Sequence, residues 1–403
     1  MHILLIHQAF AALDEAGGTR HYEIAAHLVR HGHNVTIIAS HISYLTGKNG
    51  VHGGKQESDG MVIYRTYTYP ALHKSFIHRV ISFFSFMISS FFKGLQIRQI
   101  DLVWGTSPPI FQAFSAWLLA RLKSVPFLFE VRDLWPAFAI EVGVLRNPIL
   151  IRLSLWLERF LYQHADLVVV NSPGYVEHVK NKGANRVVMI PNGSDVSMFD
   201  PKIKNLKFRK EHDLQNKFLI AYAGAHGLSN DLGIILETAK QLQDDKKIHF
   251  LLIGDGKEKP ALMISAKEMK LENITFLDPV PKKQMAEVLA AADACIGILK
   301  PLDLYKTTYP NKVFDYMAAG RPVLLAIDGV IRQVVEKAGC GLFVQPGDAE
   351  DLAEKSKILR NNPKKAKVMG LAGRKYIMEH FNRVAIADQF LNIINDLTYK
   401  INH

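Results

Sequence analysis

Short apolar runs that alternate with longer amphipathic stretches constrain the fold of this chain more than any other feature. Such an alternation is typical of β-α units built around a parallel sheet, because strands buried on both faces are apolar throughout. The first series of expected strands is HILLIH, NVTIIAS, MVIYRTY, DLVWGT, PFLFEV, DLVVVNS and RVVMIP, at residues 2–7, 34–40, 61–67, 101–106, 126–131, 166–172 and 186–191.

A second series of strands begins at FLIAYAG (218–224) and continues through IHFLLIGDG, ITFLD, ACIGIL, PVLLAI and GLFVQP. Between the two series lies PNGSDVSMFDPKIKN (191–205), which is rich in turn formers and lysine and is the best linker in the chain. We therefore predict two α/β halves, an N-terminal domain over 1–195 and a C-terminal domain over 196–381. Their sheets would face each other across a cleft, with ligands beyond the carboxyl ends of the strands.

Composition limits the function classes. The 403 residues suit two domains, and 48% apolar with 22% charged residues indicate a globular protein. The formal net charge of +11 fits a binder of nucleic acid, of a membrane surface or of phosphorylated ligands. No nucleic-acid-binding signature is present, which excludes the first class. Two cysteines without a CxxC pair and an N-terminus without a signal-peptide pattern favour the cytoplasm.

Glycine-rich turns follow several of the expected strands. Gly17 and Gly18 precede a helix, where backbone can approach an anionic ligand closely, although a flexible turn is an equal alternative. Gly224, His226 and Gly254 lie in two further turns that can cradle phosphate, although a histidine in a turn is often merely exposed. The chain contains no GxGxxG, which disfavours a dinucleotide cofactor.

Charged residues end one apolar strand and begin one helix. Arg132 and Asp133 follow PFLFEV, where charges are costly unless they line a polar cleft or pair with each other, and we take both as candidate catalytic residues. Asn311 and Lys312 open a helix that suits a diphosphate, and Asp315 can accept hydrogen bonds from a ribose diol. The alternative is a surface pair of Lys312 with Asp315.

Metal-ligand motifs are absent from the sequence. Neither Asp-x-Asp nor His-Glu-x-x-His occurs, so we expect no metal and no cofactor. Lys312, Arg132 and backbone amides would then stabilise the negative charge of the leaving phosphate.

Six stretches resemble family-four glycosyltransferases of the GT-B fold: GGTRHYEIA, EVRDLWP, ADLVVVNSPGYVEHV, IPNGSDVSMF, YAGAHGLSNDLGIILETA and PNKVFDYMAAGRPV. The resemblance runs almost end to end and is closest to the bacterial WbuB-like (L-fucosamine) and WcaI-like (colanic-acid) transferases of surface polysaccharide synthesis. It implies retaining, metal-independent transfer from a nucleotide sugar, usually UDP-linked. The acceptor would lie on the N-terminal domain and the nucleotide on the C-terminal domain. The final helix, 382–403, would pack back on the N-terminal domain.

The resemblance also assigns roles to single positions. It places ribose hydroxyls at Asp315, where the family has a glutamate, and the sugar or diphosphate at Gly17 and Gly18. The chain departs from the family pattern at Arg132, which replaces a histidine, and at Thr307, which replaces a glutamate. It also has Ala225 and Asn230 near the positions of the arginine and lysine that clamp the diphosphate.

The segment 74–98 is basic and rich in phenylalanine. No acidic residue occurs from Gly60 to Ile100, whereas Arg65, Lys74, Arg79, Lys93 and Arg98 are basic. The apolar stretch from Val80 to Phe92 is shorter than the roughly 20 residues that span a bilayer. We therefore predict a helix that lies in an anionic membrane surface, the alternative being an ordinary helix with one buried face.

These features together predict a glycosyltransferase. We expect it to move a sugar, an N-acetylated amino sugar in our interpretation, from a UDP-sugar to a polyprenyl-diphosphate-linked saccharide. Its place would be the cytoplasmic face of the membrane, in the synthesis of O-antigen, capsule or exopolysaccharide. Two alternatives stay open, an enzyme like the UDP-N-acetylglucosamine 2-epimerases and a non-catalytic nucleotide-sugar-binding protein.

Overall fold

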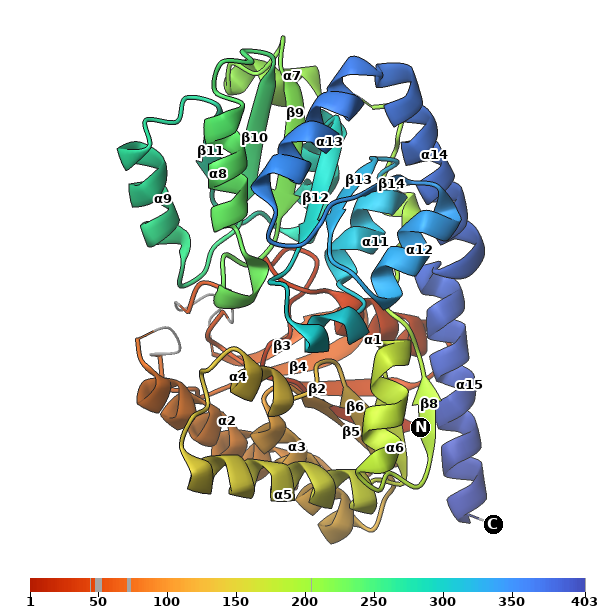
Figure 1. Ribbon diagram of the computed structural model, residues 1–403. Coiled ribbons are helices and arrows are strands. Elements are labelled where there is room, and N and C mark those ends of the chain that lie inside the picture. The colour runs from red at the N-terminus through yellow and green to blue at the C-terminus, as the bar shows by residue number, and fades with distance from the viewer. Residues whose placement is uncertain (44, 48–52, 71–73, 204, 403) are drawn as a thin grey trace. The chain divides into compact units, whose positions relative to one another are not determined.

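The computed structural model describes residues 1–403 except 44, 48–52, 71–73, 204 and 403, and it contains two compact α/β units (Figure 1). Unit 1 comprises residues 1–12, 17–191 and 384–403, and unit 2 comprises residues 13–16 and 192–383. Each unit has its own sheet, with eight strands in unit 1 and six in unit 2. The predicted α/β class with two Rossmann-like domains is confirmed.

The sheet of unit 1 has the strand order β3-β4-β2-β1-β5-β6-β7-β8, and only the β3–β4 pair is antiparallel. The central strands are buried along almost their whole length, which explains their continuous apolar runs. The strands are β1 (His2–Ile6), β2 (Asn34–Ser40), β3 (Gly54–Ser58), β4 (Met61–Thr66), β5 (Leu102–Ser107), β6 (Phe127–Val131), β7 (Leu167–Val170) and β8 (Val187–Met189).

One strand of unit 1 was missed by the sequence analysis. Strand β3 has the polar sequence GKQES and lies at the edge of the sheet, largely exposed. An edge strand without a buried face needs no apolar residues, so it leaves no alternation to detect.

The helices of unit 1 lie on two faces of its sheet. The chain moves along the sheet in one direction from β1 through α1 to β2, and in the other direction from β5 through α3 to β6. Because such connections are right-handed, α1 lies on one face of the sheet, and α2, α3 and α5 lie on the other. Helix α15 lies against α1, where His27 Nε2 and Asp388 Oδ1 are 2.7 Å apart. The helices are α1 (Arg20–Arg30), α2 (Phe76–Gln96), α3 (Ile110–Lys123), α4 (Ala137–Glu141), α5 (Pro148–His164), η1 (Pro173–Tyr175), α6 (Val176–Asn181) and α15 (Arg383–Asn402).

Helix α2 forms within the basic segment 74–98, where a helix was predicted. It spans 21 residues, Phe76–Gln96, and so extends beyond the apolar stretch from Val80 to Phe92 on both sides. Of the described helices, it alone is long and apolar enough by composition to cross a membrane, with 22% of the tested window buried. One face of α2 packs on α3, where Ser115 Oγ donates to the Met87 carbonyl at 2.8 Å.

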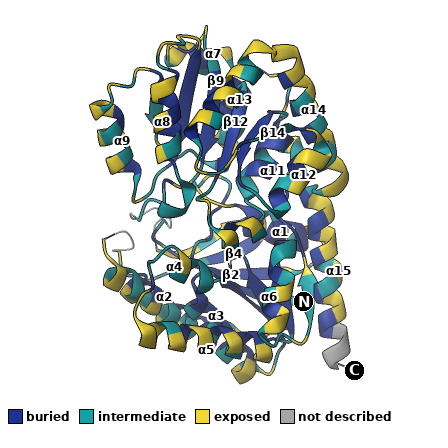
Figure 2. Ribbon diagram, viewed as in Figure 1, coloured by how far each residue is buried: buried dark blue, intermediate teal, exposed yellow. Residues whose placement is uncertain are grey.

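The sheet of unit 2 is parallel throughout, in the order β11-β10-β9-β12-β13-β14, and two apolar clusters cover its faces. Figure 2 shows the buried strands inside a shell of more exposed helices. The strands, all predicted, are β9 (Phe218–Ala223), β10 (Ile248–Ile253), β11 (Ile274–Leu277), β12 (Ala294–Ile298), β13 (Val323–Ala326) and β14 (Gly341–Phe343). The helices are η2 (Val196–Met198), α7 (Leu206–Glu211), η3 (Leu228–Asn230), α8 (Gly233–Gln241), α9 (Lys259–Glu268), α10 (Lys282–Ala291), η4 (Asp303–Thr307), α11 (Asn311–Ala318), α12 (Val330–Ala338), α13 (Ala349–Asn361) and α14 (Pro363–His380).

Candidate functional site

Each sheet has one point where the order of its strands reverses direction. In unit 1 this point lies between β1 and β5, and in unit 2 between β9 and β12. Loops at the carboxyl ends of strands diverge at such a point and leave room for a ligand. The predicted site residues of both units follow strands at or next to these two points.

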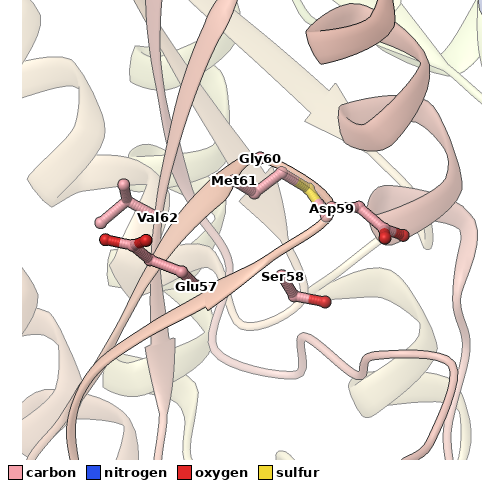
Figure 3. Close-up of a pocket in the computed structure, with 6 residues that line it drawn as sticks. All are labelled: Glu57, Ser58, Asp59, Gly60, Met61 and Val62. Carbon is pink, nitrogen blue, oxygen red and sulfur yellow. The ribbon is translucent and has the colours of Figure 1, made fainter.

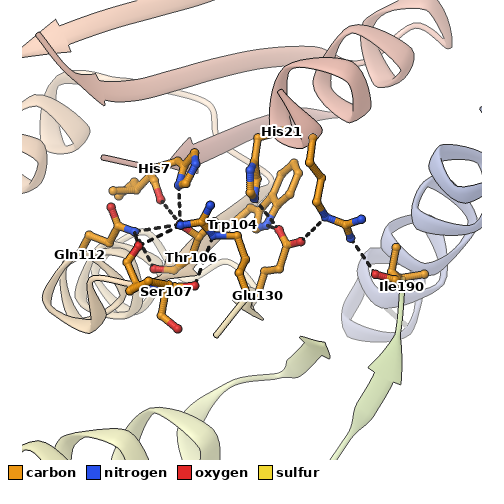
Figure 4. Close-up of polar contacts among 12 residues, drawn as sticks. His7, His21, Trp104, Thr106, Ser107, Gln112, Glu130 and Ile190 are labelled. Atoms are coloured by element: carbon orange, nitrogen blue, oxygen red, sulfur yellow. Dashed lines mark hydrogen bonds and ion pairs between the residues drawn. The ribbon is translucent and has the colours of Figure 1, made fainter. Parts of the chain in front are cut away.

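A buried carboxylate organises the carboxyl edge of the sheet in unit 1 (Figure 4). Glu130 is fully buried, with Oε1 2.9 Å from Arg20 Nε and Oε2 2.8 Å from His21 Nε2 and 3.0 Å from Trp104 Nε1. Burial opposes ionisation of Glu130, but His21 and Arg20 outweigh it and hold its pKa well below the usual range. Arg20 also donates to the carbonyls of Ile190 and Pro191.

Two histidines stack beside this carboxylate. The rings of His7 and His21 are 4.0 Å apart between centroids, and His7 Nδ1 lies 2.8 Å from Thr106 Oγ1. His7 Nε2 is buried without a hydrogen-bond partner among the described residues. Burial lowers the pKa of His21 to about 4 and that of His7 well below its usual value, so both rings are neutral near pH 7. A neutral imidazole with an unused nitrogen can accept or donate one hydrogen bond to a ligand.

Arg132 and Asp133, the candidate catalytic residues, follow β6 directly. Arg132 is half-buried and donates to the carbonyls of Ser107 and Pro108 at 3.3 and 3.0 Å. Asp133 is exposed, and no ion pair joins it to Arg132 in the described part of the chain. An Arg132–Asp133 ion pair would have given both residues a purely structural role. Among the described residues that pair is absent, so a role in a functional site stays the interpretation.

Gly17 and Gly18 lie just before helix α1 in unit 1. Gly17 has a φ of +155° and passes so close to Ala11 that a Cβ at this position would lie 2.8 Å from the Ala11 Cβ. Gly18 has no neighbour within 4 Å of the position of a Cβ. The backbone at Gly18 is thus open to a ligand on this side.

Two glycine loops of unit 2 pack directly on each other. The Gly224 amide donates to Ile253 O at 2.9 Å, and the His226 amide donates to Asp255 O at 2.8 Å. A Cβ on Gly254 would lie 1.9 Å from Gly224 O, and one on Gly256 would lie 2.5 Å from His226 O. Only glycine permits this approach of the loops after β9 and β10.

His226 lies buried between these loops, so the alternative of an exposed turn histidine is wrong. Neither ring nitrogen has a hydrogen-bond partner among the described residues. Burial, with the positive charges of Lys259 and Lys312, lowers the pKa of His226 to about 4. A buried polar group without a partner is costly unless a ligand or water satisfies it.

Lys312 extends from the start of α11 to the first of these loops. Its Nζ lies 2.7 Å from Tyr222 Oη and 3.0 Å from Asn230 Oδ1, and no carboxylate pairs with it within the described ranges. A Cβ on Gly224 would lie 2.9 Å from this Nζ. Burial lowers the pKa of Lys312 to about 7. A cation held without a counter-charge beside backbone amides is suited to an anionic ligand.

Asp315, one turn further along α11, is held by other residues of unit 2. Its Oδ1 accepts from Ser194 Oγ at 2.7 Å, and its Oδ2 lies 2.5 Å from Lys282 Nζ. Asn311 Nδ2 is 3.4 Å from the same Oδ2. The expected alternative of a Lys312–Asp315 surface pair is wrong, because each side chain has different partners.

Two other features lie apart from these residues. The ligand atoms of His27, His31 and Asp388 lie within 4.8 Å of one another and can hold a metal, but His27 and Asp388 already satisfy each other and join α1 to α15. A hollow at the turn between β3 and β4 is formed by consecutive residues of one hairpin, Glu57–Val62, at the sheet edge (Figure 3).

Sequence reasoning missed several residues that the structure places beside the predicted ones. His7 and His21 leave no local motif, although His7 follows the central strand β1, and that position is itself a signal. Lys282 begins a helix 33 positions before Asp315, and no spacing rule connects the two.

Comparison with known proteins places the chain in a family. Residues 16–193 match the model of the glycosyl transferase 4-like domain, and residues 217–362 match that of the glycosyl transferases group 1. The chain therefore belongs to the group 1 glycosyltransferases, with a 4-like N-terminal domain and the GT-B fold. This membership favours glycosyl transfer over the epimerase and the non-catalytic alternatives.

Individual relatives agree with this membership. The putative colanic acid biosynthesis glycosyl transferase WcaI of Escherichia coli K12 is 24% identical over 92% of this chain and 94% of its own length. A diacetylbacillosaminyl-diphospho-undecaprenol N-acetylgalactosaminyltransferase of Campylobacter jejuni is 24% identical over 61% of this chain and 65% of its own length. Both relatives are glycosyltransferases by name, in agreement with the family that the two domain models show.

Solved structures share the fold. A sucrose-phosphate synthase of Thermosynechococcus elongatus superposes with a TM-score of 0.79 at 19% identity, over 99% of both chains. HepE of Anabaena, solved in complex with UDP-glucose, superposes with a TM-score of 0.73 at 16% identity, over 98% of this chain and all of that one.

The Glu130 cluster yields a stability prediction. Glu130→Gln leaves Arg20 buried without its counter-charge, so we expect unit 1 to lose about 3–5 kcal/mol of its free energy of unfolding. All 4 tryptophans lie in unit 1, so the urea midpoint of tryptophan fluorescence reports this unit alone. Glu177→Gln, at an exposed position of the same unit, is the matched control and should change the midpoint little. Equal midpoints for the two variants would contradict the assigned role of Glu130.

Proposed function

We propose that this glycosyltransferase transfers an N-acetylated amino sugar from a UDP-sugar to a polyprenyl-diphosphate-linked saccharide, with retention of configuration and without a metal. The observation that carries the proposal is Lys312, an ammonium group beside the Gly224 and Gly254 loops that has no carboxylate partner among the described residues. A sugar diphosphate supplies the negative charge that this position lacks.

The nucleotide sugar would bind to unit 2. Lys312 would hold the diphosphate, and the amides around Gly224 and the ring of His226 would contact phosphate or sugar. Asp315 would accept from a ribose hydroxyl, because a carboxylate has about four lone-pair sites and its three described partners leave one unused. The UDP-glucose complex of the HepE protein, which has the same fold, supports this kind of donor.

Unit 1 would bind the acceptor. Arg132 offers a positive group and Asp133 an exposed carboxylate at the end of one strand, and we propose both as catalytic residues. As the glycosidic bond breaks, charge develops on the leaving phosphate oxygens, and groups already in place stabilise it without reorganisation. Lys312 and backbone amides of unit 2 would supply that stabilisation in place of a metal.

Helix α2 supports a lipid-linked acceptor because of the residues that it exposes. An ordinary surface helix exposes polar residues, whereas α2 exposes large apolar ones. Its small polar residues face the protein: Ser82 and Ser90 are buried, and Ser89 Oγ donates to Tyr67 O at 2.6 Å. Phe83 and Phe86 are buried, but six other large apolar residues face outward along one stripe, at spacings of three and four: Ile77, Ile81, Phe84, Ile88, Phe92 and Leu95. Such a stripe is stabilised in the membrane interface rather than in water.

The phenylalanines of α2 differ in exposure, and only exposed residues would enter the membrane. Phe83 is 8% exposed and packs on Phe111 of α3, so it belongs to the interior of unit 1. Phe84, Ile88 and Phe92 are 40%, 52% and 60% exposed and would enter the membrane. The undecaprenol-linked substrate in the name of the Campylobacter jejuni relative supports a polyprenyl acceptor, and with it a position on the inner face of the cytoplasmic membrane.

A donor screen tests the proposed reaction. The protein is incubated with UDP-N-acetylhexosamines and UDP-deoxyamino sugars, bacterial membrane extract and EDTA, and glycolipids are analysed by mass spectrometry. We expect one donor to extend a polyprenyl-diphosphate saccharide with the donor's anomeric configuration. Lys312→Met should lower turnover about 10²–10³-fold, because a preorganised charge is lost. Donor epimerisation without acceptor, or UDP binding without transfer, would instead favour the two alternative functions.

The lowered pKa of Lys312 gives UDP binding a pH dependence. Above about pH 7 the free protein loses the ammonium proton, so a diphosphate must bind together with a proton, and affinity falls by up to about tenfold per pH unit. Calorimetry between pH 6.5 and 8.5, in buffers of different ionisation enthalpy, counts the proton taken up. Lys312→Arg keeps its charge throughout this range and serves as the control. If both proteins respond alike to pH, Lys312 does not hold the diphosphate.

Membrane attachment through α2 is tested by sedimentation with vesicles. We expect the protein to pellet with phosphatidylglycerol vesicles, less at high salt and weakly with phosphatidylcholine, because each basic residue near an anionic surface contributes about 1 kcal/mol. Ile81→Ser with Ile88→Ser should remove the binding that survives high salt. Persistence of that binding in the double variant would contradict a role for α2.

A further inference from the structure

Helix α5 (Pro148–His164) has the same inverted pattern as α2. Its polar residues Ser154 and Glu158 face the protein and are buried, together with Leu161 and Tyr162. Its outward side carries large apolar residues at exposures from 37% to 70%: Ile149, Leu150, Leu153, Leu155 and Trp156. A helix that only covers a sheet would place these two sets the other way round.

Helix α3 joins α5 to α2 in one layer of unit 1. Trp117 of α3 lies edge-on to Phe160 of α5, with ring centroids 4.7 Å apart, and Phe111 of α3 contacts Phe84 of α2 at 4.6 Å. The three helices cover the same face of the sheet (Figure 1). The outward stripes of α2 and α5 therefore point to the same side of unit 1, away from its sheet.

The charges of α5 indicate which kind of surface this helix binds. Arg152 and Arg159 are exposed, as is Arg146 just before the helix, whereas the one acidic residue of the helix, Glu158, is buried. His178 Nε2 lies 2.9 Å from Glu158 Oε1, and Lys182 pairs with Oε2, so this carboxylate is neutralised inside the protein. The surface of α5 thus presents apolar side chains among positive charges only, which fits an anionic lipid surface and not an acidic-and-basic protein interface.

We propose that α5 is a second membrane-docking helix, and that α2 and α5 together seat unit 1 on anionic phospholipid, with Trp156 at the level of the headgroups. The inference rests on the membrane attachment included in the proposed function and extends it from one helix to a surface. Two helices on one face fix the tilt of unit 1 against the bilayer, which a single helix does not. Tryptophan is the side chain that favours this interfacial depth.

The test compares four proteins on vesicles of phosphatidylglycerol and phosphatidylcholine. They are the unmodified chain, the α2 variant Ile81→Ser with Ile88→Ser, the α5 variant Leu153→Ser with Trp156→Ser, and a control with Ile264→Ser and Val368→Ser. The control residues are 58% and 67% exposed on α9 and α14 of unit 2 and match the α5 positions in exposure. We expect the α5 variant to lose at least about tenfold in partition, as the α2 variant does, and the control to bind normally.

The outcomes separate the inference from the proposal on which it rests. If the unmodified chain does not bind vesicles, the proposed membrane attachment fails and α5 docking fails with it. If it binds, and only the α2 variant is weakened, the attachment stands and the role of α5 is overturned. Thermal melts by circular dichroism show whether each variant is folded, which we expect because the replaced side chains are exposed.

Two measurements give an independent readout. Difference spectra between the unmodified chain and Trp156→Phe should show a blue shift of Trp156 on vesicles and quenching by brominated lipid near the headgroups. An unquenched Trp156 on bound protein would overturn the proposal. Light scattering after size exclusion tests a second copy as the occupant. If the unmodified chain is a dimer, the α5 variant is a monomer and both bind vesicles equally, the lipid assignment is overturned in favour of self-association.

Discussion

The burial of the Glu130 carboxylate is the constraint on which the carboxyl edge of unit 1 depends. A fully buried charge must be neutralised and hydrogen-bonded, so α1, β5 and β6 are held in register by Arg20, His21 and Trp104. Arg20 extends the same network to Ile190, near the point where the chain leaves unit 1. Gly18 and Arg132, which flank this cluster in sequence, are thereby fixed at one edge of the sheet.

Unit 2 positions its candidate site by close backbone approach rather than by a buried ion pair. The Gly224 and Gly254 loops touch at distances that no side chain would allow, and the space beside them is filled by Lys312. This arrangement accounts for the departure from the family pattern. Asn230 lies near the position where the resemblance expects a lysine, and its Oδ1 is 3.0 Å from Lys312 Nζ. The positive charge is present at nearly the same place, but it is supplied from α11.

Two inverted helices give unit 1 a face unlike the rest of its surface. Ser89 and Glu158 can face the protein at little cost because a backbone carbonyl and basic side chains satisfy them, whereas Ser82 Oγ has no partner among the described residues. Phe86 and Leu161 of these helices are buried, but several of their other large apolar residues are turned outward. The membrane attachment that we propose would explain this outward stripe, because lipid would stabilise the outward side chains and would bring a lipid-linked substrate to the protein.

The sequence by itself determined the architecture, because strands buried on both faces of a parallel sheet must be continuous apolar runs, and these are visible without neighbours. The polar edge strand β3 was missed because no face of it is buried. Local motifs also located Lys312, Asp315 and the glycine loops. Only the tertiary structure decided their partners, since Glu130 meets Arg20 across 110 positions and Lys312 meets Tyr222 across 90. Likewise, periodicity separates the two faces of α2 and α5, but which face is inside depends on the hydrogen bonds and charges that other elements bring to it.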